Sequence, residues 1–190
     1  MHCAYYVDTA EKLMPAMDLL IDTIAKKIAQ YHGVVKTGRT HLMDAMPLTI
    51  DQELGAWNTQ LLNARASLIT VLDALRFLPQ GGTAVGTGIN AHPRFAREFC
   101  KAISPLVGFK AETSNDYFRN LSSQDLSVQL SGELKNLAVI LMKISNDLRW
   151  MNSGPLAGIA EVELQALQPG SSIMPGTVSY THLRAHETDR

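Results

Sequence analysis

The sequence predicts an all-α protein, a bundle of long helices. Residues 50–78 and about 120–152 both carry apolar side chains at alternating spacings of three and four, which places those side chains on one face of a helix. No run of alternating apolar and polar residues is long enough to predict a buried strand. The 190 residues, of which 46% are hydrophobic, supply one sizeable core.

Helices are expected in the following order. The first covers about residues 10–32, and its inward-facing residues are Leu13, Met17, Leu20 and Ile24. The second begins after Pro47, where Thr49 and Gln52 have the spacing of a capping box, and it ends at Pro79. Its apolar stripe is Leu54, Trp57, Leu61, Ala64, Leu68, Val71, Leu75 and Leu78.

A shorter helix is predicted to begin near Pro93 and to end before Pro105. The last long helix, over about 120–152, has a second stripe with the same spacing: Leu130, Leu134, Leu137, Leu141, Ile144, Leu148 and Met151. At about 1.5 Å per residue each long helix runs roughly 40 to 50 Å. That length suits an oligomeric bundle better than a small isolated domain.

Three irregular stretches, residues 33–48, 79–92 and 153–176, separate the helices. Loops on a rigid scaffold often carry function. In the first stretch, GRTHLMDAMPLT (38–49), Thr40 and His41 are adjacent. A histidine beside a hydroxyl can transfer a proton near neutral pH, although a loop histidine is commonly a capping or surface residue.

The other two loops are rich in glycine and serine. GGTAVGTGIN (81–90) contains neither a phosphate-binding nor a dinucleotide-binding pattern, so its glycines admit either a ligand or close packing between helices. In PGSSIMPG (169–176), Ser171 and Ser172 lie between glycines, where backbone N–H groups could stabilise an alkoxide. No Ser-His-Asp order or GxSxG elbow favours a hydrolase, and an ordinary turn is the alternative.

Charge and cysteine content restrict partners and compartment. A formal net charge of −1 provides no basic field for nucleic acid or for an anionic membrane surface, and no stretch is long enough to span a bilayer. Cys3 and Cys100 have no CxxC spacing and are expected to be reduced thiols of a cytoplasmic protein. His182 and His186 lack a third ligand nearby, so no metal site is expected.

Together these motifs resemble those of the fumarase/aspartase superfamily, and their sequences are similar to those of class II fumarate hydratases. The resemblance covers residues 1–176 and rests on GRTHLMDAMPLT, GGTAVGTGIN, MKISNDLRWMNSGPLAG (142–158) and PGSSIMPG, in the family's order. His41 favours fumarase, because aspartases carry glutamine after GRT. Aspartate ammonia-lyase and a non-catalytic helical oligomerisation fragment are the alternatives.

The resemblance implies the central helical domain of this fold over residues 1–176 and a homotetramer whose active sites are shared between subunits. It implies reversible hydration of fumarate to L-malate, a step of the tricarboxylic acid cycle, without cofactor or metal. Ser171 would be the catalytic base and His41 the paired acid/base group, while Thr40 and Ser172 would bind substrate.

The match stops abruptly at residue 177. Thr177 and Ser179 stand where the family has the lysine and asparagine that hold substrate, and residues 177–190 are expected to be a disordered or foreign tail. The family's SSND motif, which would precede Met1, is absent. These departures predict a chain truncated at both ends, with a misjoined reading frame at residue 177, and inactive by itself.

Overall fold

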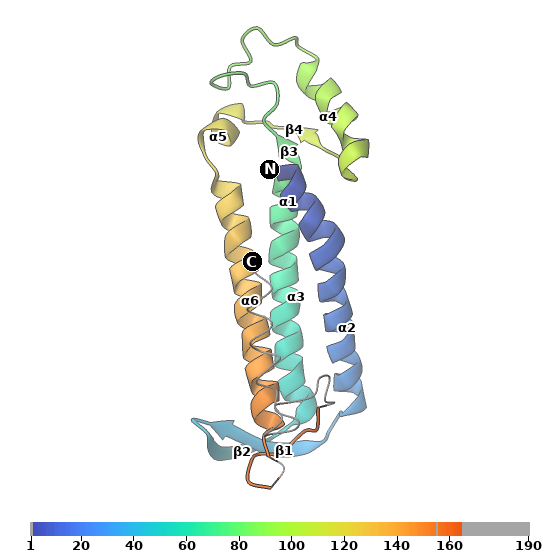
Figure 1. The fold of residues 1–190 in the computed structure, drawn as a ribbon, viewed down its shortest axis with the longest axis vertical. Coiled ribbons are helices and arrows are strands. Elements are labelled where there is room, and N and C mark those ends of the chain that lie inside the picture. The colour runs from blue at the N-terminus through green and yellow to red at the C-terminus, as the bar shows by residue number, and fades with distance from the viewer. Residues whose placement is uncertain (1, 155, 165–190) are drawn as a thin grey trace, which may run out of the picture. The chain divides into compact units, whose positions relative to one another are not determined.

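The computed structural model describes residues 2–154 and 156–164. The chain divides into two compact units, Met1–Ile140 and Leu141–Arg190. Long helices dominate the described residues and the strands are short, which confirms the predicted all-α class (Figure 1). The predicted boundary at 176/177 lies outside the described residues. None of the described helices has the length and apolar content needed to cross a lipid bilayer.

The N-terminal helical segment begins near residue 2 rather than residue 10. It consists of α1 (His2–Asp8), a π-helical turn (Thr9–Leu13) and α2 (Met14–Gln30). Pro15 explains the wide turn, because proline lacks an N–H and its ring crowds the carbonyl group four residues earlier. The N–H of Met14 accordingly donates to the carbonyl oxygen of Thr9, five residues back.

Two of the four residues predicted to face inward, Met17 and Ile24, are buried in α2. Met14 and Ile21 are buried in place of Leu13 and Leu20, which are only partly buried. The sequence contains the adjacent apolar pairs Leu13–Met14 and Leu20–Ile21, so both faces satisfy helical periodicity. Packing against α3 (Ile50–Leu75) determines which face is buried.

α3 confirms the predicted stripe and its start. Gln52 Oε1 accepts a hydrogen bond from the backbone N–H of Thr49 at 3.0 Å, as part of the capping box. Six stripe residues are at most 2% exposed: Trp57, Leu61, Ala64, Leu68, Val71 and Leu75. Arg65 ties α3 to α2, because its Nε and Nη2 donate to the two carboxylate oxygens of Asp18 at 2.5 and 3.2 Å.

α3 ends at Leu75, earlier than Pro79, because the next residues join a small parallel sheet. β3 (Phe77–Leu78) pairs with β4 (Glu112–Thr113). The N–H of Glu112 donates to the carbonyl oxygen of Arg76 at 2.9 Å, and Leu78 stays buried at 3% exposure. Sequence periodicity could not reveal this sheet, since two-residue strands carry no pattern.

α4 (Phe95–Val107) runs through Pro105, so the prediction that it ends before this residue was wrong. A proline in the last turn removes one helical hydrogen bond, and the helix stops soon afterwards at Gly108, whose φ of +73° suits a left-handed C-cap. One face of α4 contributes Cys100 to a buried cluster with Leu78, Phe109 and Ala111.

The helix predicted over 120–152 consists of two helices, α5 (Tyr117–Ser122) and α6 (Asp125–Met151). Ser123 adopts an extended backbone, and its Oγ accepts a hydrogen bond from the N–H of Asp125 at 3.2 Å. Such a side-chain bond starts a new helix instead of continuing the old one. In the second unit, the carbonyl oxygen of Met151 accepts from the N–H of Glu161 at 2.8 Å.

Candidate active site

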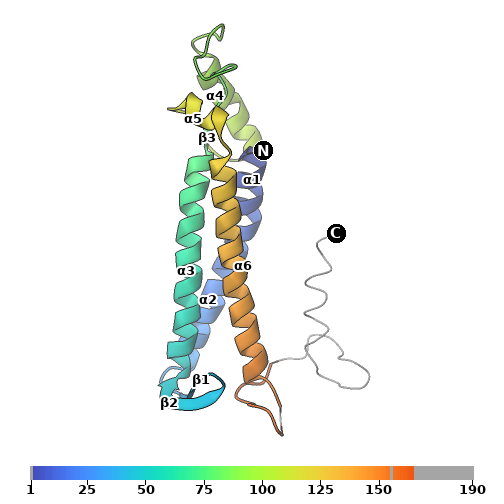
Figure 2. The same cartoon turned by 90° about the vertical axis from the view of Figure 1, so that its left-hand side faces the viewer.

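The segment containing Thr40 and His41 is a β-hairpin, so the prediction of an irregular stretch over 33–48 was wrong. β1 (Val35–Thr40) pairs antiparallel with β2 (Met43–Thr49) (Figure 2). The hairpin was missed because its side chains do not alternate between apolar and polar types. Most of them are exposed in the single chain, so no buried face imposes that alternation.

His41 and Leu42 form the two-residue turn of this hairpin, next to the Thr40–Met43 pair. Their φ values are +52° and +62°, and a type I′ turn requires positive φ at both central residues. Such turns usually contain Asn-Gly. His41-Leu42 stands at these positions here, so the sequence did not predict a hairpin turn. Non-glycine residues in this region are strained and concentrate at functional sites, which favours a chemical role for His41.

Gly38 forms the irregularity in the hairpin, where the pairing register shifts between Thr37 and Arg39. A Cβ atom at this position would collide with the carbonyl oxygen of Met46 and would lie 2.9 Å from Cδ2 of Leu48. The glycine therefore allows the two strands to approach, and the shifted register sets which residues form the turn.

Replacing Gly38 by alanine is expected to lower the free energy of unfolding by about 1–3 kcal/mol, because the added methyl group overpacks the hairpin. Gly55 is the matched control: it lies within α3 and has no atom within 4 Å of an added Cβ. Gly55→Ala should raise stability by about 0.5–1 kcal/mol through helix propensity. Urea unfolding measures both variants, and equal effects would contradict the packing role of Gly38.

The base of the hairpin is fixed to the start of α3. Asp51 accepts hydrogen bonds from the N–H of Gly33 and from Nδ1 of His32, both at 3.1 Å. A hydrogen bond from the Thr49 side chain, followed by those from Gly33 and His32, holds the pKa of the Asp51 carboxyl below its usual value. These bonds keep the strands attached to a rigid helix, which is how a loop residue gains a defined position.

An ion pair adds a second attachment. Lys36 on β1 pairs with Glu53 on α3, and its side chain is only 7% exposed. A buried ammonium group needs such a partner, because removing an unpaired charge from water costs on the order of several kcal/mol. Lys36 therefore has a structural partner on α3.

The tip of the hairpin combines the polar candidates with apolar side chains. Thr40 and His41 are exposed in the single chain. Leu42, Met43 and Met46 are 71%, 70% and 80% exposed. A proton-transfer site works best when bulk water is excluded. In the single chain the hairpin supplies Thr40 and His41, but no other described segment shields them from water.

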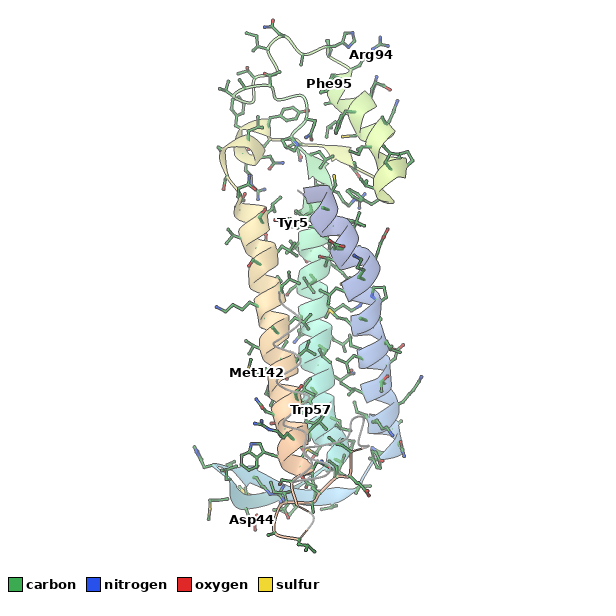
Figure 3. The ribbon with its side chains drawn as sticks, in the orientation of Figure 1. Tyr5, Asp44, Trp57, Arg94, Phe95 and Met142 are labelled. Carbon is green, nitrogen blue, oxygen red and sulfur yellow. The ribbon has the colours of Figure 1, made fainter. Side chains whose placement is uncertain are left out.

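The glycine-rich loop lies at the other end of α3, beyond β3 (Figure 1). Asp44 on the hairpin and Arg94 at the start of α4 mark the two ends in Figure 3. With 26 residues, α3 separates the loops by about 39 Å. Within one chain, the structure therefore does not bring the hairpin and the glycine-rich loop together.

Packing against α5 explains two glycines of this loop. A Cβ atom on Gly82 would lie 2.9 Å from Cβ of Tyr117, and one on Gly86 would lie 2.9 Å from Cδ1 of Phe118. Gly86 also has a φ of +101°. The geometry supports the close-packing interpretation of this loop over ligand contact.

The other candidate residues, Ser171 and Ser172 of PGSSIMPG and the histidine pair His182 and His186, lie outside the residues that the structure describes. Among the residues that are described, no three His, Cys, Asp or Glu side chains are grouped to hold a metal ion. The described part of the site is thus Thr40 and His41 on the hairpin.

Comparison with known proteins gives consistent matches. A family model described as lyase matches residues 1–183. Fumarate hydratase class II 2 of Pseudomonas aeruginosa is 55% identical over 178 residues, which are 94% of this chain and 39% of that protein. Fumarate hydratase class II of Xylella fastidiosa is 56% identical over 168 residues, which are 88% of this chain and 36% of the relative.

Solved structures agree. A class II fumarase from Schistosoma mansoni has a TM-score of 0.88 and 34% identity, and the match covers 99% of this chain and 42% of that one. A fumarate lyase:delta crystallin from Brucella melitensis has a TM-score of 0.84 and 34% identity over 98% of this chain and 41% of its own. The chain thus spans about two fifths of the length of these relatives.

Proposed function

The chain belongs to the lyase family, and from this premise we propose that it is part of a class II fumarate hydratase, which interconverts fumarate and L-malate. The observation that carries the proposal is the position of His41: it follows GRT and occupies a strained, exposed turn beside Thr40. The activity belongs to the complete protein, because this chain spans about two fifths of its relatives.

The proposed role of His41 follows from the chemistry of dehydration. A base removes a proton from C3 of L-malate, which gives an aci-carboxylate intermediate, and the C2 hydroxyl then leaves. Hydroxide is a poor leaving group unless it is protonated, and an imidazole titrates in the right range to supply that proton, here through a water molecule. An ammonia-lyase does not have this requirement, which favours hydration over deamination.

Ser171 is the proposed base, and Ser172 and Thr40 are the proposed hydrogen-bond donors to a substrate carboxylate or to the intermediate. Fixed donors stabilise negative charge that develops during the reaction. A serine becomes a base only when neighbouring dipoles and cations lower its pKa strongly. Thr177 stands where the family has a lysine, so the proposed site of this chain lacks the charge that would do so.

We further propose a homotetramer whose sites are shared between subunits. Exposed apolar side chains on α3 and on the first half of α6 support this: Leu62, Ile69, Val128, Leu134 and Val139 are 38–71% exposed. Further helices would cover them.

A chimera tests the proposed activity. Residues 1–176 of this chain replace the matching segment of the Pseudomonas aeruginosa protein, and fumarate formation from L-malate is followed by ultraviolet absorbance. We expect an active tetramer by light scattering, whereas the 190-residue chain alone should be inactive. Aspartate serves as the competing substrate. Deamination of aspartate without malate turnover would replace hydratase by ammonia-lyase, and no turnover of either substrate would favour a non-catalytic segment.

A further inference from the structure

The two cysteines of the sequence come together where α1 meets α4. Cys100 belongs to the buried cluster with Leu78, Phe109 and Ala111, and Cys3 packs against that same cluster. The Cα atoms of α1 and α4 approach within 8 Å of one another. In both views the start of α1 lies near the C-terminal end of α4, next to β3 (Figures 1 and 2).

The two thiols differ in access. Cys3 is partly exposed and lines a cavity of about 480 Å³, whose walls include Leu78, Phe99 and Ile103. Cys100 is 4% exposed. A small reagent in this cavity can therefore reach Cys3. Cys100 lines a separate cavity of about 470 Å³, but its side chain is almost fully buried, so it is the less accessible thiol.

We propose that Cys3 and Cys100 form a reversible intramolecular disulfide that links α1 to α4, with Cys3 as the thiol that first attacks the oxidant and Cys100 as the resolving thiol. Disulfides need Cα atoms roughly 4.4–6.8 Å apart. Some Cα atoms of α1 and α4 lie within 8 Å of one another and both cysteines contact the same cluster, so the disulfide requires Cys3 and Cys100 to approach to that range. This inference is independent of the proposed function.

The chemistry balances with a small-molecule disulfide as oxidant, such as oxidised glutathione. The Cys3 thiolate attacks one sulfur of the oxidant, which forms a mixed disulfide and releases one glutathione thiolate. Cys100, once deprotonated, attacks Sγ of Cys3 and releases the second glutathione thiolate. The two protein thiols lose two electrons and two protons, and one oxidant disulfide is reduced to two thiols.

Burial accounts for the order of attack. Burial raises the pKa of the Cys100 thiol, and the neighbouring Cys3 and Glu112 raise it further. A thiol with little thiolate reacts slowly with reagents in solution. Resolution within the chain still proceeds, because both cysteines contact the same buried cluster of one chain and the effective concentration is therefore high.

The test uses the 190-residue chain with oxidised glutathione, followed by peptide mapping and by titration of free thiols after denaturation. The wild-type chain should lose both thiols and yield a peptide pair joined through Cys3 and Cys100. Cys100→Ser should keep one glutathionyl group on Cys3. In Cys3→Ser, Cys100 should react about tenfold more slowly than Cys3 does in the wild type, because it is buried.

Three results would overturn the proposal. One is persistent glutathione on Cys3 in the wild type, with Cys100 still free. Another is equal reaction rates of Cys100 in Cys3→Ser and of Cys3 in the wild type. The third is a bond between chains, which a mixture of nitrogen-15-labelled and unlabelled protein detects by mass. The thermal midpoint gives a separate check: oxidation should raise it in the wild type and in neither variant.

Discussion

Replacing His41 by asparagine in the active chimera is expected to lower kcat/KM for L-malate by about 10²–10⁴-fold, the usual contribution of one general acid or base. Asparagine is the appropriate substitute, because it tolerates positive φ better than most residues and His41 has a φ of +52°. The change thus removes the titrating group and preserves the turn. Malate dehydration kinetics with an unchanged far-ultraviolet circular dichroism spectrum would establish this.

Leu42→Asn is the matched control, since it introduces the same residue at the adjacent turn position, where φ is +62° and the side chain is 71% exposed. Its activity should stay within a few-fold of the parent. An equal loss in both variants would mean that turn shape, or the apolar tip, matters more than the imidazole. A fully active His41→Asn protein would remove His41 from the mechanism.

Replacing Leu68 by alanine is expected to lower the free energy of unfolding by about 2–5 kcal/mol, because the residue is 0% exposed and the truncation leaves a cavity in the stripe of α3. The size of the loss depends on how far neighbouring side chains can close the space. Urea unfolding of the 190-residue chain, followed by circular dichroism, measures the effect.

Leu62→Ala provides the control on the same helix, because Leu62 is 46% exposed in the single chain. Its cost should be well below that of Leu68→Ala. If the two variants lose equal stability, another chain covers the outward face of α3, which would itself support the proposed oligomer. A negligible loss in Leu68→Ala would contradict the assignment of the core.

The same physics explains which features could be predicted. The stripe from Trp57 to Leu75 was readable because a long helix buried along one side repeats its apolar residues with the helical period. The Thr49 cap was readable because capping depends on residues three apart in sequence. Both patterns involve residues that are close in sequence, so they can be recognised without knowing which other elements the helix packs against.

The hairpin and the buried face of α2 could not be predicted from such local patterns. The turn at His41 and Leu42 has no Asn-Gly signal, and its strands have no alternation because their side chains are exposed. Leu13 ends the π-helical turn and Met14 begins α2, and no local signal predicts which of these adjacent apolar residues is buried. Contacts with other elements determine the shape of this turn and the buried face of α2.

By itself the sequence determined the all-α class, the long helices, the start of α3 and the motifs by which the chain resembles its family. Only the tertiary structure decided that His41 occupies a strained two-residue turn, that the glycine-rich loop lies at the far end of α3, and that Cys3 and Cys100 share one cluster. The division has one physical reason. Helical period and capping act over a few residues, whereas turn shape without its usual residues, distances between loops and the meeting of distant thiols follow from long-range packing.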